Sequence, residues 1–149
     1  MRIALGADHA GYHLKTELRH WLAQEGYEVV DVGAHAREAA DDYPDYAAAV
    51  GRAVLQGEAD LGVMVCGTGV GSSIALNKLE GIRAAVCGDT FSARLSRAHN
   101  DANVLCLGER VVGLGLAVEV LRTWLEASFC DEERHRRRLG KIRALEGES

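Results

Sequence analysis

The sequence predicts an α/β fold, a three-layer α/β/α sandwich in which helices cover both faces of a five-stranded parallel sheet. Two observations lead to this prediction. Short apolar runs recur along the chain with helical stretches between them, and most of the 17 glycines follow apolar runs, where tight turns join strands to helices. Several runs are nearly continuous rather than alternating, which is typical of strands buried on both faces of a parallel sheet.

Five strands are expected, at residues 2–6, 28–32, 61–66, 82–86 and 104–107. Between the first two, Leu14, Leu18 and Leu22 follow the spacing of an amphipathic helix, which ends near Gly26. The first unit is therefore a βαβ unit, and the short connections between the later elements favour right-handed crossovers throughout.

Further helices are expected between and after the strands. One begins near Tyr43 and Pro44, because proline is tolerated in the first turn of a helix, and it runs to about residue 57. Shorter helices follow Cys66 and Asp89. Two longer helices are indicated by apolar residues at helical spacing, which are Leu116, Val120, Leu121 and Trp124 in the first, and Leu139, Ile142 and Leu145 in an extra C-terminal helix within a charged tail.

Composition limits the class of protein. The 149 residues, 48% of them hydrophobic, fit a single domain at residues 1–149. The formal net charge of −5 gives no basic field for a nucleic-acid backbone, so no nucleic acid is expected as a partner. Neither an apolar run of 18 residues nor a secretory leader is found, which predicts a cytoplasmic protein without membrane contact. The four cysteines form no CxxC pair, so no disulfide framework is expected.

The glycine-rich segment 67–71 is the first candidate for a functional site. Ligands of parallel sheets bind beyond the carboxyl ends of the strands, and this segment joins a strand to a helix there. Its backbone N–H groups could converge on an oxyanion or a phosphate, or it could be only a capped tight turn. The segment has neither the lysine of a P-loop nor the GxGxxG spacing of a dinucleotide-binding turn.

Several titratable side chains near the strand ends have two interpretations each. Cys66 is either a thiolate activated at the head of the turn or a small buried residue, whereas Cys87 and Cys106 fit only the second interpretation. Asp8 is either a helix N-cap or an acceptor in the site. His99 precedes a strand, and is either a general acid/base or a cation at the end of a helix.

Two other patterns invite metal or phosphate. His9 and His13 are spaced i, i+4, but no third ligand is evident, so no metal is expected. Arg134 and Arg138 share a helix face without an acidic partner at that spacing. Two guanidinium groups one turn apart suit a phosphate, although plain surface charge is the alternative.

Six motifs follow one another along nearly the whole chain. The two most specific are CGTGVG at residues 66–71 and HNDANVL at residues 99–105, and the others are GADHAG at 6–11, DYP at 42–44, NK with GIRA at 77–84, and GERVVG at 108–113. Together they resemble the ribose-5-phosphate isomerase type B family, which also contains allose-6-phosphate and galactose-6-phosphate isomerases.

The resemblance implies a Rossmann-like sandwich and an aldose–ketose isomerase that needs neither metal nor cofactor. Such an enzyme interconverts D-ribose 5-phosphate and D-ribulose 5-phosphate through a cis-enediolate, in the pentose phosphate pathway. Cys66 resembles the base that moves a proton between C2 and C1. His99 resembles the acid/base that opens the sugar ring, helped by Thr68 and Asp8. Some relatives carry a glutamate base where this chain has Ser72, so Cys66 places it in the cysteine-base branch.

The resemblance also implies the substrate contacts. The oxygens of the enediolate would be held by the backbone of Gly67, Gly69, Val70 and Gly71 and by the side chain of Asn100. The phosphate would be held by His9, Arg110, Arg134 and Arg138, with Tyr43 near the sugar. Family sites are built at a dimer interface, so a homodimer with shared active sites is expected, with a tetramer made of two such dimers as the alternative.

Two alternatives to ribose 5-phosphate isomerisation stay open at this stage. The catalytic motifs are shared by isomerases of hexose 6-phosphates and tetrose phosphates, and the loop at 33–42 gives no pattern that selects a sugar. A nucleotide-binding module that uses residues 67–71 as its phosphate loop is the alternative from another class, although the lysine and the acidic ribose partner of such modules are missing.

Overall fold

The sheet has five parallel strands in the order β2-β1-β3-β5-β4, in a computed structural model that describes residues 1–147. The strands are β1 (Arg2–Ala7), β2 (Glu28–Gly33), β3 (Leu61–Cys66), β4 (Ala84–Val86) and β5 (Val104–Gly108). All five expected strands are confirmed, and the ends differ from the expected ones by at most two residues.

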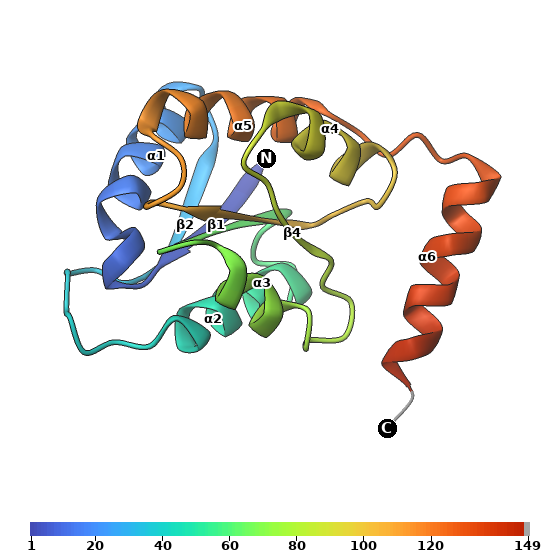
Figure 1. Cartoon of the computed structure of the whole chain (residues 1–149), viewed down its shortest axis with the longest axis horizontal. Helices are drawn as coiled ribbons and strands as arrows, with labels where there is room; N and C mark the ends of the chain where they lie inside the picture. The colour runs from blue at the N-terminus through green and yellow to red at the C-terminus, as the bar shows by residue number, and fades with distance from the viewer. Residues whose placement is uncertain (148–149) are drawn as a thin grey trace.

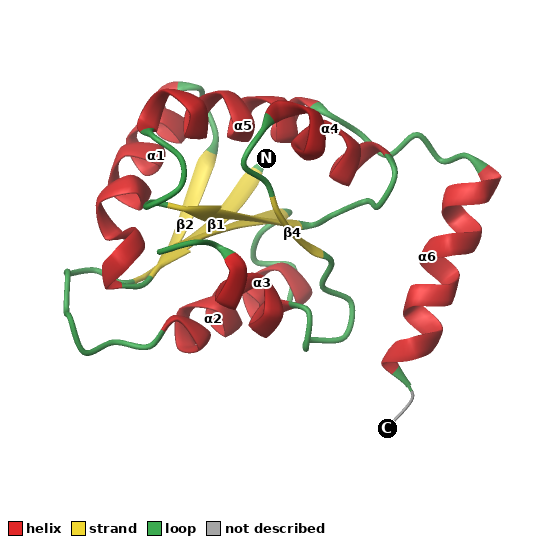
Figure 2. Cartoon of the chain, viewed as in Figure 1, coloured by secondary structure: helices red, strands yellow, loops and turns green. Residues whose placement is uncertain are grey.

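Helices cover both faces of this sheet (Figures 1 and 2). On one face lie α1 (Tyr12–Gln24), α4 (Thr90–Ala98) and α5 (Leu114–Glu126), and on the other lie α2 (Tyr43–Leu55) and α3 (Val70–Leu76). A short 3-10 helix, η1 (His9–Gly11), connects β1 to α1. The predicted three-layer sandwich is therefore confirmed. Among residues 1–147, no helix is both long and apolar enough to cross a bilayer.

The two apolar cores explain why the strand sequences are nearly continuous. In β1, Ile3 and Leu5 belong to the core under α1 and α5, while Ala4 belongs to the core under α2 and α3. In β3, Val63 and Met64 divide in the same way. Because successive side chains point to opposite faces and both faces are covered, every position of a central strand must be apolar.

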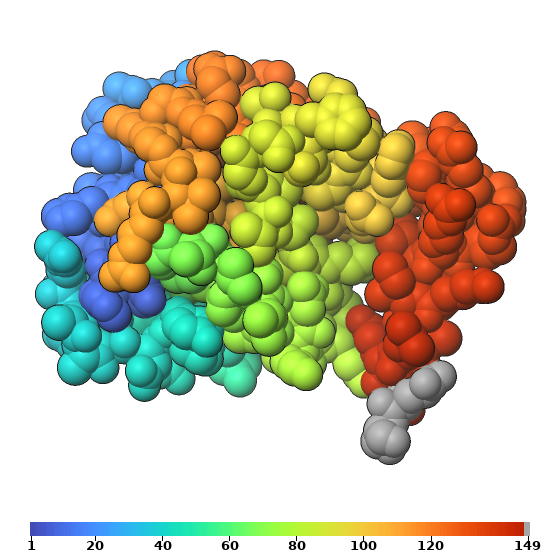
Figure 3. All heavy atoms as spheres, in the orientation of Figure 1, coloured from blue at the N-terminus to red at the C-terminus, as the bar shows by residue number. Residues whose placement is uncertain are grey.

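The C-terminal helix α6 (Glu133–Glu146) stands apart from the sandwich, beside the edge strand β4 (Figure 1). It contacts the body near its two ends. The ring of His135 stacks on that of His99 with the centroids 4.2 Å apart, and at the far end the N–H of Gly81 donates to Glu146 at 2.9 Å. A cavity of about 490 Å³ lies between α6 and the body, where Figure 3 shows a hollow. The extra helix was predicted, but only His135 of it is buried.

Lys15 ties α1 to the end of β2. Its ammonium group is buried, and it donates to Oδ1 of Asp31 and to the carbonyl of Ala34, both at 2.7 Å. Burial alone raises the pKa of Asp31, but the hydrogen bonds from Lys15 and from the N–H of Gly33, with the charge of Lys15, outweigh it. The pKa of Asp31 is therefore below its ordinary value of 3.8.

Replacing Lys15 with Met should lower the free energy of unfolding at pH 7 by about 2 kcal/mol, because the largely buried carboxylate of Asp31 loses its buried charged partner and keeps only exposed ones, of which Arg19 lies 3.3 Å from Oδ2. A depressed pKa contributes stability above the ordinary value and loses it as the pH falls through the folded-state pKa. The difference from wild type should therefore shrink below about pH 4. Urea titrations across pH test this, with Lys78→Met as an exposed control; equal losses in both variants would contradict it.

Candidate active site

A cavity of about 230 Å³ opens at the carboxyl ends of β1 and β3. Four connections that are distant in the sequence supply its lining, which consists of Asp8, His9, Ala10, Tyr43, Cys66, Gly67, Thr68, Gly71 and Arg110. Ala10 apart, all of them are residues that the sequence singled out as candidates. The carboxyl ends of parallel strands lie side by side, so the connections that follow these ends converge on one place.

The turn after β3 holds the sulfur of Cys66 at the inner end of this cavity. Cys66 is 4% exposed, and the backbone N–H of Gly69 donates to its Sγ at 3.2 Å. Gly69 has a φ of 81°, a left-handed conformation that side chains disfavour. A donor directed at sulfur supports negative charge there, which a proton-abstracting thiolate requires.

The other cysteines take no part in this cavity. Cys87 and Cys106 are buried, and burial raises the pKa of both thiols. Cys130 is exposed, and all four cysteines are free. The predictions that no disulfide framework exists and that Cys87 and Cys106 are packing residues are confirmed.

Gly71 allows Tyr43 to reach the cavity. A Cβ at position 71 would lie 2.5 Å from Cζ of Tyr43 and 2.8 Å from its hydroxyl oxygen, so any side chain there would displace the ring. Tyr43 is the first residue of α2, and Pro44 beside it favours that start. The last glycine of the CGTGVG motif is therefore required by a contact with a distant helix rather than by the turn itself.

His9 is held by Asp41. Oδ1 of Asp41 lies 2.6 Å from Nδ1 of His9 and accepts the backbone N–H of His9 at 3.0 Å. Asp8 caps η1 by accepting the N–H of Gly11, which confirms its N-cap role, and it also lines the cavity. Ligand atoms of Asp8, His9 and Asp41 lie within 4.8 Å of one another, a spacing that suits a cation. Oδ1 of Asp8 and Oδ1 of Asp41 form hydrogen bonds with Gly11 and His9, so we interpret the group as a hydrogen-bonded cluster.

His99 and Asn100 lie at the amino ends of the strands, opposite the carboxyl ends where the cavity opens. They precede β5, whose last residue, Gly108, pairs with Cys66. Five residues of extended chain place the two ends of β5 about 13 Å apart. The 230 Å³ cavity therefore does not contain His99 or Asn100 of the same chain.

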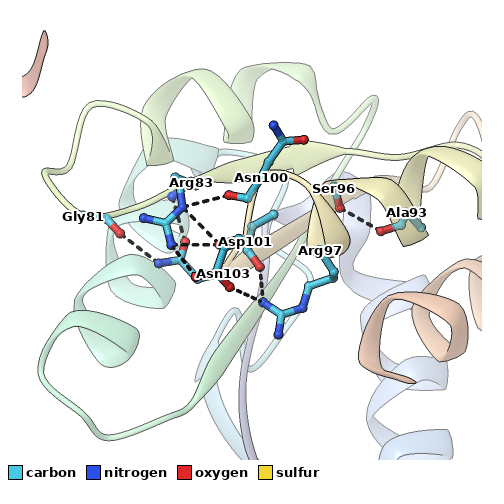
Figure 4. A network of polar contacts seen from close by, with 9 residues as sticks. Gly81, Arg83, Ala93, Ser96, Arg97, Asn100, Asp101 and Asn103 are labelled. Carbon is cyan, nitrogen blue, oxygen red and sulfur yellow. Dashed lines mark hydrogen bonds and ion pairs between the residues drawn. The ribbon is translucent and has the colours of Figure 1, made fainter. Parts of the chain in front are cut away.

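A network of hydrogen bonds fixes the segment that carries Asn100 (Figure 4). The guanidinium of Arg83 donates to the carbonyl of Asn100 at 3.0 Å and to that of Asp101 at 2.8 Å. Asp101 has a φ of 45°, and Arg97 donates to the carbonyl of Ala102 at 2.6 Å. Figure 4 shows the Asn100 amide pointing away from this network, and Asn100 is exposed.

Arg134 and Arg138 lie in the first half of α6 and are also outside the 230 Å³ cavity. Both are exposed, but Arg134 contacts Oε2 of Glu132 at 3.2 Å. Helical spacing does not predict this contact, because Glu132 is the cap residue before the helix. Next to Arg134, burial and then the charges of His99 and Arg134 lower the pKa of His135. Arg134 and Arg138, whose spacing suits a phosphate, therefore lie on the side of the molecule that carries His99 and not beside Cys66.

Comparison with known proteins identifies the chain's relatives. A family model described as Ribose/Galactose Isomerase matches residues 3–142. The chain belongs to this isomerase family. Ribose-5-phosphate isomerase B of Escherichia coli K12 is 50% identical over 145 residues, which cover 97% of this chain and 96% of the relative. D-erythrulose-4-phosphate isomerase 2 of Mycolicibacterium smegmatis is 40% identical over 149 residues, covering 99% and 98%.

Solved structures of family members share the fold. Ribose-5-phosphate isomerase B of Clostridium thermocellum superposes with a TM-score of 0.95 at 54% identity, covering 98% of this chain and 97% of that one. The enzyme of Mycoplasma genitalium, solved with bound ribulose-5-phosphate, has a TM-score of 0.93 at 39% identity, with 99% and 97% covered. These likenesses confirm the family resemblance expected from the motifs.

Sequence reasoning missed three residues that support the site. Asp41 lies in a loop without a readable pattern, and its contact with His9 spans 32 positions. Arg83 and Asp101 fall within matched motifs, but no local spacing connects them. A left-handed conformation at a non-glycine residue such as Asp101 is visible only in a structure.

Replacing Arg83 with Met should loosen the segment at 99–103, because the backbone carbonyls of Asn100 and Asp101 lose a charged donor. We expect a loss of about 2 kcal/mol in the free energy of unfolding. Amide hydrogen exchange should quicken at Ala102 and Asn103 more than in the central strands. Arg94→Met, an exposed change on α4, is the control, and unchanged exchange at 102–103 would contradict the role of Arg83.

Proposed function

We propose that this protein is an aldose–ketose isomerase that interconverts D-ribose 5-phosphate and D-ribulose 5-phosphate in the pentose phosphate pathway. The observation that carries the proposal is the cavity in which Cys66, with a donor at its sulfur, faces Thr68, Asp8 and the basic side chains of His9 and Arg110. The likeness to relatives named for this activity supports the choice of substrate.

The proton transfer is assigned to Cys66. The thiolate takes the proton from C2 of the open-chain aldose, and the electron pair of that bond forms the cis-enediolate. The hydroxyl proton of O2 moves to O1, and the S–H group then returns its proton to C1, so that C2 becomes the ketose carbonyl and the thiolate is regenerated. Stabilisation of the charge on the enediolate oxygens is assigned to backbone N–H groups of residues 67–71, of which those of Gly69 and Val70 donate to the Cys66 sulfur and the Thr68 hydroxyl.

The remaining roles require a second copy of the chain. Ring opening is assigned to His99, enediolate binding in part to Asn100, and phosphate binding in part to Arg134 and Arg138. These residues lie away from the cavity of their own chain. We therefore propose a homodimer in which they complete the partner's cavity, where His9 and Arg110 hold the phosphate from the other side. Pairing of dimers into a tetramer is compatible with this arrangement.

The whole chain, residues 1–149, is proposed to act as one catalytic domain in the cytoplasm, where phosphorylated sugars are metabolised. A tetrose phosphate is the second candidate substrate. The observation that favours it is the relative named D-erythrulose-4-phosphate isomerase 2, which matches over nearly its full length.

Purified protein with EDTA present should convert ribose 5-phosphate to ribulose 5-phosphate faster than it converts allose 6-phosphate, galactose 6-phosphate or erythrulose 4-phosphate. Cys66→Ala should lower kcat about a thousandfold or more, since it removes the acid/base group, while sugar-phosphate binding is retained. Coupled assays and calorimetry measure the two quantities.

Cys130→Ala is the matched control, because it removes an exposed cysteine that does not line the cavity. A Cys66→Ala enzyme with wild-type turnover would contradict the assigned base. Turnover of the tetrose alone would keep the mechanism and change the substrate.

A further inference from the structure

We propose that Asp41 is a positioning residue, which fixes the ring of His9 so that Nε2 is presented to the phosphate group of the substrate. The effect of Asp41 on catalysis rests on the proposed function, whereas the contact between Asp41 and His9 does not. Asp41 belongs to the loop between β2 and α2, a segment that no motif connects to the cavity.

One oxygen of Asp41 restrains both the backbone and the ring of His9. Oδ1 accepts the His9 N–H at 3.0 Å and lies 2.6 Å from Nδ1. A residue held at its main chain and at its ring nitrogen has little freedom about either side-chain torsion. The ring of His9, which lines the cavity, is therefore preset before any ligand arrives.

The contact also determines which nitrogen carries the proton. An ionised carboxylate only accepts hydrogen bonds, so Nδ1 must be the donor. Any second proton on the imidazole must then be on Nε2, the nitrogen that Asp41 leaves free. In the cationic ring, Nε2–H is the donor available for an anionic oxygen in the cavity.

The burial of Asp41 indicates that its carboxylate depends on His9. The side chain is 8% exposed, and Oδ2 is buried without a hydrogen-bond partner among residues 1–147. No lysine or arginine of the described chain forms an ion pair with it. The nearby groups are acidic or neutral, namely Asp8 and Tyr46, whose hydroxyl pKa is raised by burial and then by the charge of Asp41. A buried carboxylate is costly unless paired, and His9 is the partner that compensates it.

Nitrogen NMR of the free protein tests the geometry without any substrate. With 15N-labelled histidine, wild-type His9 should show a protonated Nδ1 at all pH values at which Asp41 is ionised. In Asp41→Asn, whose amide can donate as well as accept, the Nε2–H tautomer should become populated. Glu38→Gln, an exposed charge change in the same loop, should leave the spectrum of His9 unchanged.

Kinetics and phosphate binding test the consequence. Asp41→Asn should raise the KM for ribose 5-phosphate and the Kd for inorganic phosphate by about tenfold, with kcat within about twofold of wild type. In a His9→Asn background, Asp41→Asn should add no further increase, because the two residues act as one unit. A residue that only stabilised the fold would instead lower the melting temperature and act independently of His9.

The proposal requires both the tautomer change and the shared loss of phosphate affinity. An unchanged tautomer, an unchanged phosphate Kd, or effects that multiply in the double variant would each overturn it. If the wild-type protein failed to convert ribose 5-phosphate while both signatures appeared, the proposed reaction would fall and the Asp41–His9 pairing would stand.

Discussion

The alignment of β3 with its two neighbours is the constraint on which the active-site cavity depends. Cys66 ends β3 opposite Gly108 of β5, and Ala7 ends β1 opposite Val65. This register brings the connections after the three strands to one point. A Cβ on Gly108 would lie 2.5 Å from the carbonyl carbon of Thr68, so the absence of a side chain there allows the turn after β3 to cross the end of β5.

The apolar pattern was enough to predict the sheet, the helices and the half of the site that lies at the strand ends. Adjacent residues such as Ile3 and Ala4 face two different cores, so apolar residues are required at successive positions of the central strands. Cys66 and the glycine turn follow directly from a strand end. Such features are local, and local features are visible in a single sequence.

Long-range side-chain contacts could not be predicted in this way. The partnership of Asp41 with His9, and the dependence of Asn100 on Arg83, join loops whose relative position is set by the whole sheet. Position 72 shows that burial, too, can escape prediction. Ser72 is fully buried with a hydroxyl that lacks a hydrogen-bond partner in the described part of the chain, which its sequence context does not suggest.

The division of site residues between the two edges of the sheet has a functional meaning. The carboxyl ends of the strands carry Cys66, His9 and Arg110, and the opposite ends carry His99 and Asn100 together with two arginines of α6. In the function that we propose, each group is one half of a site, and a homodimer would let each chain supply the half that its partner lacks. Symmetric pairing would form two complete sites at once.

Subunit complementation tests this central claim most directly. Cys66→Ala and His99→Asn proteins, each inactive alone, would be unfolded, mixed in equal amounts and refolded together. A shared site predicts recovery of roughly a quarter of the wild-type activity, because half of the dimers are mixed and each mixed dimer has one intact site. A mixture that stays as inactive as its components would contradict the account.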